Sequence, residues 1–205
     1  MVRVTRLVLL LTLLASLSAA FSACSSEEAR PFAGTRRTPA PNLTATLPDV
    51  GGESFHFVAG KDQVLIVYFG YTSCPDVCPT TMADVRVARN GLDDDGDRVQ
   101  VAMVTVDPGR DSDTVLSSYV NSFVPGSTAL RTEDDDMLAA AAAEFGVFYE
   151  VTTLDDGSIE VAHSGTLFAV DDQGTLTASW PFGTPSSDLQ NDLSILLSET
   201  KEANT

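Results

Sequence analysis

Two long runs of apolar residues constrain the fold of this 205-residue chain more than any other feature. The first is QVLIVYFGY at 63–71, and the second is RVQVAMVTVD at 98–107. Both are rich in β-branched residues, so each predicts a strand that is buried on both faces. Between them, apolar residues at helical spacing from Pro79 to Arg89 predict a helix that ends near Gly91. This order of strand, helix and strand predicts a parallel βαβ unit.

The rest of the chain continues the alternation. The further predicted elements are a strand at 54–58, helices at 111–123 and 132–146, a strand at 148–152, a hairpin at 164–180 and a last helix at 186–199. In the second of these helices, Thr132 is the candidate N-cap and Gly146 the stop signal. The pattern predicts an α/β, thioredoxin-like fold: a central mixed sheet flanked by helices, with an extra N-terminal strand segment and an insertion. Reactive residues are then expected at the carboxyl end of the central strand.

The first 23 residues have the pattern of an export signal. Arg3 and Arg6 precede the apolar stretch LVLLLTLLASLSAA, which is shorter than the about 20 residues that span a membrane. Small residues then lead to Cys24, as in a bacterial lipoprotein cleavage box, although Phe21 stands where that box usually has leucine. We therefore predict a lipoprotein signal at 1–23 with lipidation of Cys24. An uncleaved anchor, or a cleaved signal with Cys24 as a spare thiol, stays open.

Either signal predicts that the folded part lies at the outer face of the cytoplasmic membrane, in a bacterial setting. Residues 24–42 are polar and contain Pro, Gly, Ser and Thr without an apolar period, which predicts a flexible tether. The domain is expected at 43–200, followed by a short tail at 201–205.

The net charge argues against one class of partner. The chain has 12 Lys and Arg against 29 Asp and Glu, which gives −17 at pH 7. Because a phosphate backbone binds basic surface, no nucleic-acid partner is expected. The acidic runs LDDDGD and TEDDDM lack the ligand spacing of a calcium loop, so they indicate solvated loops and helix starts.

The cysteine pair lies where the first buried strand turns into the helix. Pro75 disfavours helical backbone at Cys74, so Cys74 is predicted in the loop. Pro79 suits the first helical position, which makes Cys78 the predicted N-cap. The helix dipole favours thiolate there, and both redox exchange and metal binding need thiolate. A redox dithiol, a metal site and a structural disulfide all stay open, although so short a loop makes the last a weak source of stability.

A third ligand would distinguish a metal site from a redox dithiol. His56 lies in the strand predicted at 54–58 and is expected to be a surface or packing residue. His163 comes immediately before the predicted hairpin, in a loop that approaches the cysteine loop in a thioredoxin arrangement. Two sulfurs and one imidazole suit Cu(I), or Cu(II) with an added ligand. A structural zinc site would want a fourth protein ligand, and none is evident.

Three segments of the chain carry a resemblance to a known family. FGYTSCPDVCPTTM at 69–82 resembles the copper-site segment of the Sco/SenC family, thioredoxin-like copper-binding proteins involved in cytochrome c oxidase assembly. VTVDPGRDSDTVLSSYV at 104–120 is similar to the Val-Asp-Pro-x-Arg-Asp segment of that family. HSGTLFAVDDQG at 163–174 is similar to its His-Ser before a strand and a turn. The matches occur in the family's order over most of 50–198.

The resemblance assigns roles to individual residues. It implies that Cys74 and Cys78 are the copper cysteines and that His163 is the copper histidine. Asp107 matches an aspartate that lies close to the copper site in this family. Asp76, between the cysteines, is a candidate for tuning the thiols, with a solvated loop acid as the equal alternative.

The resemblance also implies a function. It indicates a membrane-anchored copper metallochaperone that uses Cu(I) or Cu(II) and serves the CuA-containing subunit of cytochrome c oxidase. The alternative is a thiol–disulfide reductase that keeps the copper-site cysteines of that subunit reduced. A peroxidase is disfavoured because the sequence has no Thr-x-x-Cys arrangement with a suitably placed arginine. The copper donor and the thiol reductant are not identified by the sequence.

Overall fold

The computed structural model describes residues 30–38 and 40–204. The predicted signal at 1–23 and the predicted lipidation site Cys24 therefore lie outside the described residues. Phe32–Thr205 forms one unit with its own core. Within the described part of the chain, no helix combines the length and the apolar character that crossing a bilayer would require.

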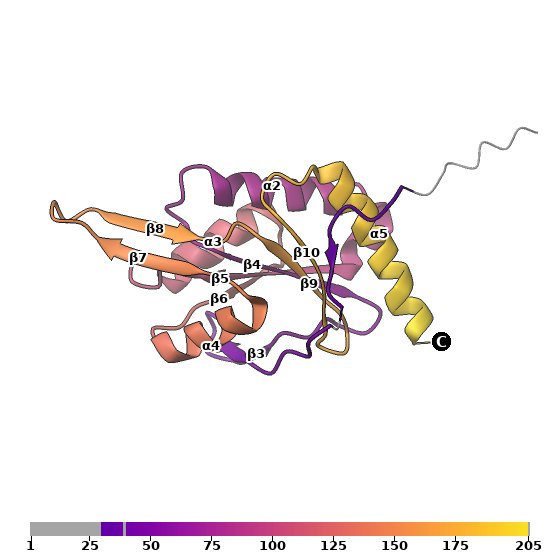
Figure 1. Cartoon of the computed structure of the whole chain (residues 1–205), viewed down its shortest axis with the longest axis horizontal. Coiled ribbons are helices and arrows are strands. Elements are labelled where there is room, and N and C mark those ends of the chain that lie inside the picture. Colours follow the sequence, from indigo (N-terminus) through magenta and orange to yellow (C-terminus); the bar gives the residue numbers. More distant parts are fainter. Residues whose placement is uncertain (1–29, 39, 205) are drawn as a thin grey trace, which may run out of the picture. The chain divides into compact units, whose positions relative to one another are not determined.

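From β4 to α4 the described chain alternates strands with helices, and runs of consecutive strands come before and after this part, as expected for an α/β fold with a mixed sheet (Figure 1). The strands are β1 Thr35–Arg36, β2 Thr46–Pro48, β3 Ser54–His56, β4 Val64–Gly70, β5 Val99–Thr105, β6 Thr128–Leu130, β7 Tyr149–Thr153, β8 Ile159–His163, β9 Leu167–Val170 and β10 Leu176–Trp180. The helices are α2 Val77–Asn90, α3 Asp113–Phe123, α4 Asp135–Phe145 and α5 Ser186–Ala203, with a 3₁₀ helix η1 at Asp93–Arg98.

The central sheet confirms the predicted mixed arrangement. Its six strands lie in the order β1-β10-β9-β4-β5-β6. β4 pairs with β5 in parallel register, and β5 pairs with β6 in the same way. β9 is antiparallel to both β4 and β10, which confirms the late hairpin. Every residue of β4 is buried, as the unbroken apolar run predicted.

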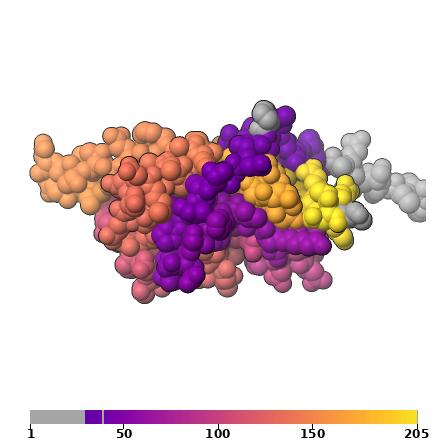
Figure 2. Space-filling model, turned by 90° about the horizontal axis from the view of Figure 1, so that it is seen from below, coloured from indigo at the N-terminus to yellow at the C-terminus, as the bar shows by residue number. Residues whose placement is uncertain are grey.

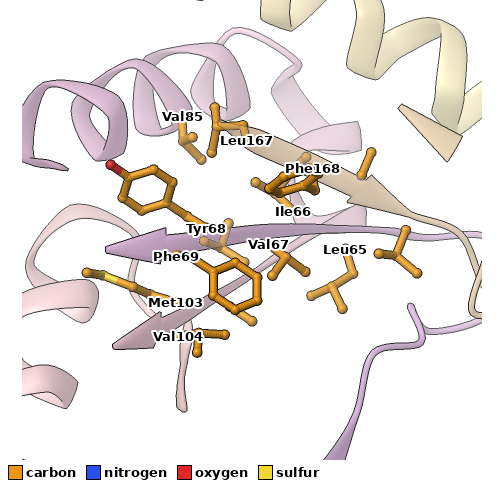
Figure 3. Packing of buried hydrophobic residues seen from close by; sticks show 14 of the residues in the cluster. Leu65, Ile66, Val67, Tyr68, Phe69, Val85, Met103, Val104, Leu167 and Phe168 are labelled. Carbon is orange, nitrogen blue, oxygen red and sulfur yellow. The ribbon is translucent and has the colours of Figure 1, made fainter. Parts of the chain in front are cut away.

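The side chains of β4 alternate between two layers of the core, because successive residues of a strand point to opposite faces. Figure 3 shows Tyr68 on the side of α2, near Val85, and Phe69 on the other side of the strand. Phe69 packs against Phe145 of α4, with 5.3 Å between ring centroids. β4 ends at Gly70 and α2 begins at Val77, so the cysteines lie in the loop and the helix start that directly follow this buried strand.

The N-terminal boundary of the folded unit differs from the prediction. The sequence predicted a flexible tether to residue 42, but β1 at Thr35–Arg36 pairs with β10 at the edge of the central sheet. The buried carboxylate of Asp192 accepts hydrogen bonds from the backbone N–H groups of Ala33 and Gly34 at 2.8 to 3.0 Å. This contact spans almost the whole chain, so local composition could not reveal it. The domain therefore includes residues before 43.

Two small antiparallel sheets lie outside the central sheet. β2 and β3 form the first, which includes the extra N-terminal strand that the sequence predicted. The indigo segment that carries them lies against α4, as Figure 2 shows, and Thr44 donates hydrogen bonds to Glu144 of that helix. β7 and β8 form the second, a hairpin that projects from the unit in Figure 1. The sequence did not predict β8.

Two helix ends also differ from the prediction. The N-cap of α4 is Asp134, whose side chain accepts from the N–H of Met137. The predicted cap, Thr132, lies two residues earlier, and its hydroxyl accepts from the N–H of Asp134. Gly146 ends α4 in the left-handed conformation, as predicted. α5 continues to Ala203, so residues 201–203 of the predicted tail belong to this helix.

Candidate metal centre

The loop after β4 is held by a buried aspartate that follows β5. Asp111 is completely buried, and its carboxylate accepts hydrogen bonds from the N–H and the hydroxyl of Thr72. The same carboxylate accepts from the hydroxyl of Thr105 at 2.6 Å. Arg131 donates to the backbone carbonyls of Pro108 and Asp111 and so holds this second loop in turn. Thr72 lies two residues before Cys74, so Asp111 fixes the approach to the first cysteine.

The cysteines lie on either side of the start of α2. Cys74 is in the loop, as predicted, and is partly exposed. The prediction for Cys78 is wrong: α2 begins at Val77 with Asp76 as N-cap, so Cys78 lies inside the first turn, and its side chain is completely buried. The N–H of Cys78 donates to the Cys74 sulfur at 3.3 Å. Both thiols are free in this structure.

His163 is the last residue of β8, and its tautomer follows from its contacts. The Nδ1 atom lies 3.2 Å from the backbone carbonyl of Ser164. A carbonyl can only accept, so Nδ1 carries the proton and Nε2 presents a lone pair. Nε2 lies 3.5 Å from the Cys78 sulfur. The nitrogen that a metal would need is therefore directed at the thiols.

These three residues form a group that could hold a metal ion. The two sulfurs and one imidazole nitrogen all lie within 4.8 Å of one another. Among residues 30–38 and 40–204, no other cluster of three or more His, Cys, Asp or Glu meets that criterion. Thiolate and imidazole are the ligand types that copper prefers, so the donor set fits copper. The only other histidine, His56, is exposed on β3.

Asp76 and Asp107 are not members of this group. Asp76 is exposed, and its carboxylate accepts a hydrogen bond from the hydroxyl of Thr80 at 3.5 Å. The contact of Asp76 with the Cys74 sulfur comes from its backbone N–H and not from its carboxylate. Asp107 is buried and forms an ion pair with Arg110. The Arg110 guanidinium lies 5.8 Å from the centre of the Tyr71 ring, so Asp107 reaches the site only through two intervening side chains.

The surroundings of the two thiols shift their pKa values in opposite directions. Burial acts to raise the pKa of Cys74, but hydrogen bonds from the backbone N–H groups of Cys78 and Asp76 outweigh it and lower that pKa. Burial raises the pKa of Cys78 to about 12. Burial also lowers the pKa of His163, which favours the neutral ring that can bind a metal. Cys74 is thus the more available thiolate, and a metal would have to displace the proton of Cys78.

Two tyrosines enclose the group. The Tyr68 and Tyr71 rings lie 6.1 and 5.7 Å from the His163 ring, each edge to face. The Tyr71 hydroxyl interacts with the Cys74 sulfur. The Tyr68 hydroxyl is buried near the Cys78 sulfur and makes no hydrogen bond of normal geometry within the described residues. Gly70 leaves room for this packing, because a Cβ there would meet Tyr68 at 2.6 Å and the Cys78 sulfur at 3.1 Å.

Sequence reasoning missed Asp111, Tyr68 and Tyr71. Asp111 follows the Asp-Pro-Gly-Arg segment and carries no local signal of burial, because its main partner, Thr72, is 39 residues away. The tyrosines were part of the apolar run 63–71, where an aromatic residue indicates only a core position. A polar hydroxyl at the carboxyl end of a buried strand was the available signal for both.

Comparison with known proteins gives consistent matches. A family model described as SCO1/SenC matches residues 46–198. A Stutzerimonas stutzeri protein whose name describes copper binding is 30% identical over 131 residues, which cover 63% of this chain and 64% of that protein. The chain thus spans just under two thirds of that relative. A SCO2-like protein of Rickettsia prowazekii is 28% identical over 83% of this chain and 86% of its own length.

A solved structure matches as well. Apo Sco1 of Thermus thermophilus aligns with a TM-score of 0.72 and 31% identity, over 82% of this chain and 99% of that one. This likeness confirms the thioredoxin-like fold class that the order of strands and helices predicted.

Proposed function

Because the chain belongs to the SCO1/SenC family, we propose that it binds copper through Cys74, Cys78 and His163 and acts as a copper metallochaperone. The recipient that we propose is the CuA site of cytochrome c oxidase. The observation that carries the proposal is the convergence of two sulfurs and one lone-pair nitrogen within 4.8 Å, on a loop, a helix start and a strand end. Copper is the cargo of this activity rather than a resident cofactor.

The donor set supports copper over a structural metal. Thiolates select soft ions such as Cu(I), and imidazole accepts either copper state. A structural zinc site normally has four protein ligands, and within the described residues only three converge. The ligands also differ in accessibility: Cys74 is partly exposed, while Cys78 is buried. An incoming thiol could therefore displace Cys74 before Cys78, which still holds the ion from inside the protein.

Copper titration of native and variant chains tests this proposal. Under anaerobic conditions, one Cu(I) per chain should bind the native protein. His163→Ala and Cys78→Ser should each weaken binding by about a hundredfold or more, because each removes a direct ligand. His56→Ala is the matched control, since His56 is exposed on β3, and it should bind copper normally. Unchanged affinity in His163→Ala would exclude the three-ligand site.

A second function is favoured by the hydrogen bonds to the Cys74 sulfur, which lower the pKa of this thiol. In this alternative, the Cys74 thiolate attacks a disulfide of the oxidase subunit, forming a mixed disulfide and releasing one target thiolate. Cys78 then attacks the Cys74 sulfur, which releases the second target thiolate and leaves a Cys74–Cys78 disulfide. Two electrons pass to the target, and an external thiol reductant must reset the chain. Rapid reduction of a CuA-domain disulfide by the metal-free protein, unaffected by His163→Ala, would favour this role.

We also propose attachment to the outer face of the cytoplasmic membrane through Cys24. The support is the sequence pattern of residues 1–24 alone. In cells, Cys24→Ser should release the protein from the membrane fraction, and labelled fatty acid should be incorporated into the native chain only. Absence of the fatty-acid label from the native chain would indicate an uncleaved anchor instead.

A further inference from the structure

The β7–β8 hairpin leaves one strand edge open beside the metal centre. The hairpin is a two-stranded sheet of its own, so within the described residues β8 pairs with β7 and with no other strand. β8 ends at His163, one of the three converging residues. Its open edge therefore runs directly into the centre. An open strand edge offers unpaired backbone groups to another extended segment.

Two adjoining hollows follow this hairpin. One has a volume of about 390 Å³ and lies between Ile159–Ala162 of β8 and the cysteine loop, at Ser73 and Pro75. The other, of about 580 Å³, lies between the base of the hairpin and the start of α4 at Asp135. Arg110 and Ile159 line both, so the hollows are neighbours. We call the two together the hairpin groove.

The lining of the hairpin groove is largely apolar where the hairpin contributes to it. Tyr149, Val151, Ile159 and Val161 all line one of the two hollows. Val151 pairs with Val161 across the hairpin and keeps 43% of its surface exposed. Apolar side chains held open beside a reactive centre are typical of a docking surface.

The charge of the hairpin groove indicates what it would accept. Asp135, Glu150 and Glu160 line it, and none of them has an ion pair within the part of the chain that the structure describes. The one arginine of the groove, Arg110, is already paired with Asp107. The groove is therefore negative, in a chain whose net charge is −17. It complements a segment with lysine or arginine beside apolar residues.

We propose that the hairpin groove binds an extended, basic segment of the copper-receiving protein along the open edge of β8. This inference rests on the proposed function and names the chemistry of the partner's contact. A segment in this groove passes Ser73 and Pro75, which flank Cys74. Its own metal-binding thiols would therefore be brought to Cys74, which is partly exposed. The groove would select the partner and orient it, while the three ligands hold the copper.

Two matched hairpin variants test the proposal. Val151→Lys removes an apolar contact and adds a repulsive charge inside the groove. Leu154→Lys adds the same charge at a similarly exposed residue, 37% accessible, that lines neither hollow. The probe is a purified, metal-free CuA domain of cytochrome c oxidase with reduced cysteines, and calorimetry measures its Kd for the copper-loaded chain.

Val151→Lys should weaken binding of the CuA domain by about tenfold, whereas Leu154→Lys should stay within about twofold of the native chain. Salt at about 0.5 M should weaken native binding, because the contact is partly electrostatic. Equal Kd values for the two variants would overturn the proposal that the hairpin groove binds the partner. A native chain that holds copper without binding the CuA domain would overturn it as well. Failure of the native chain to bind copper would instead overturn the proposed function, and the copper affinity of each variant separates the two cases.

Discussion

Two buried aspartates perform the same mechanical task in two regions of the molecule. Asp192 on α5 accepts hydrogen bonds from the N–H groups of Ala33 and Gly34 and from the Trp180 indole, and so holds the segment before β1. Asp111 accepts from the N–H and the hydroxyl of Thr72, and so holds the loop before Cys74. Neither carboxylate has any exposed surface. In both regions a buried carboxylate holds a chain segment by its N–H groups. One segment leads into the edge strand β1, and the other leads to the proposed metal ligand Cys74.

The difference teaches how to separate stability from function in this fold. The donors of Asp192 are the N–H groups of Ala33 and Gly34 before β1, the side-chain amide of Asn191, and the indole of Trp180, the largest fully buried side chain. None of these donors belongs to the Cys-Cys-His group or to the loop that carries Cys74. The donors of Asp111 include Thr72, two positions from Cys74, so loss of the Asp111 carboxylate should lower the metal affinity as well as the stability of the fold. Matched substitutions at the two aspartates can therefore test whether the two regions are energetically independent.

The largest effect is expected for Asp192→Ala. It leaves two backbone N–H groups and the indole N–H of the buried Trp180 without their acceptor, and the free energy of unfolding should fall by roughly 3 kcal/mol. Chemical denaturation measures this loss. If the Asp192 and Asp111 regions are independent, the folded Asp192→Ala variant still binds copper with native affinity. A matching loss of copper affinity would show that the two regions are coupled.

A smaller and differently distributed effect is expected for Asp111→Asn. The amide keeps the shape of the side chain but replaces one acceptor oxygen by a donor, so it cannot accept from both Thr72 and Thr105 as before. The loop before Cys74 should become less ordered, and Cu(I) affinity should fall by about tenfold. Competition with a Cu(I) chelator measures that change.

The size of the stability loss decides how Asp111→Asn is interpreted. We expect about 1 kcal/mol in denaturation, which is too little to unfold the domain. Thr72→Val is the companion variant, because it removes the hydroxyl donor from the other side of the same contact. Native copper affinity in both variants would show that Asp111 supports the fold without positioning the cysteine loop.

The same contrast explains how much could be predicted from the sequence. β4 and β5 were predicted because a strand buried on both faces must be apolar throughout, which is a local signal. Cys74 was placed correctly because Pro75 restricts its own neighbour. The predicted helix start at Cys78 was two residues too late, since Asp76 and Cys78 both precede plausible helix starts and only the folded chain selects between them.

The features that the sequence could not reveal depend on distant partners. β1 is a polar dipeptide whose register is fixed by pairing with β10, and the two residues before it bond to Asp192, 159 and 158 residues away. β8 is only five residues long and has no regular apolar alternation, and it forms because β7 lies beside it. The proximity of His163 to the cysteines followed from the fold class and from the family resemblance. The resembling segment Val-Asp-Pro-x-Arg-Asp includes Asp111, but it gave no sign that this carboxylate binds Thr72, which lies 39 residues earlier.

The smallest expected effect concerns the reactivity of Cys74. Backbone hydrogen bonds to its sulfur lower its pKa despite partial burial, so its thiolate forms at lower pH than that of an ordinary cysteine. In the metal-free protein at pH 7, iodoacetamide should therefore modify Cys74 before Cys78, whose pKa is raised to about 12 by burial. The rate for Cys74 should rise with pH and level off at a lower pH than the rate for a free cysteine does.

The two aspartate variants should change this reaction differently. Asp111→Asn should loosen the loop and slow the Cys74 reaction at pH 7 by about threefold, because the hydrogen bonds to the Cys74 sulfur become less aligned. Asp192→Ala should leave the rate and its pH profile unchanged, and mass spectrometry of the modified peptides separates the two cysteines. An equal change in both variants would mean that the cysteine loop senses the stability of the whole unit, and the independence of the two regions would be lost.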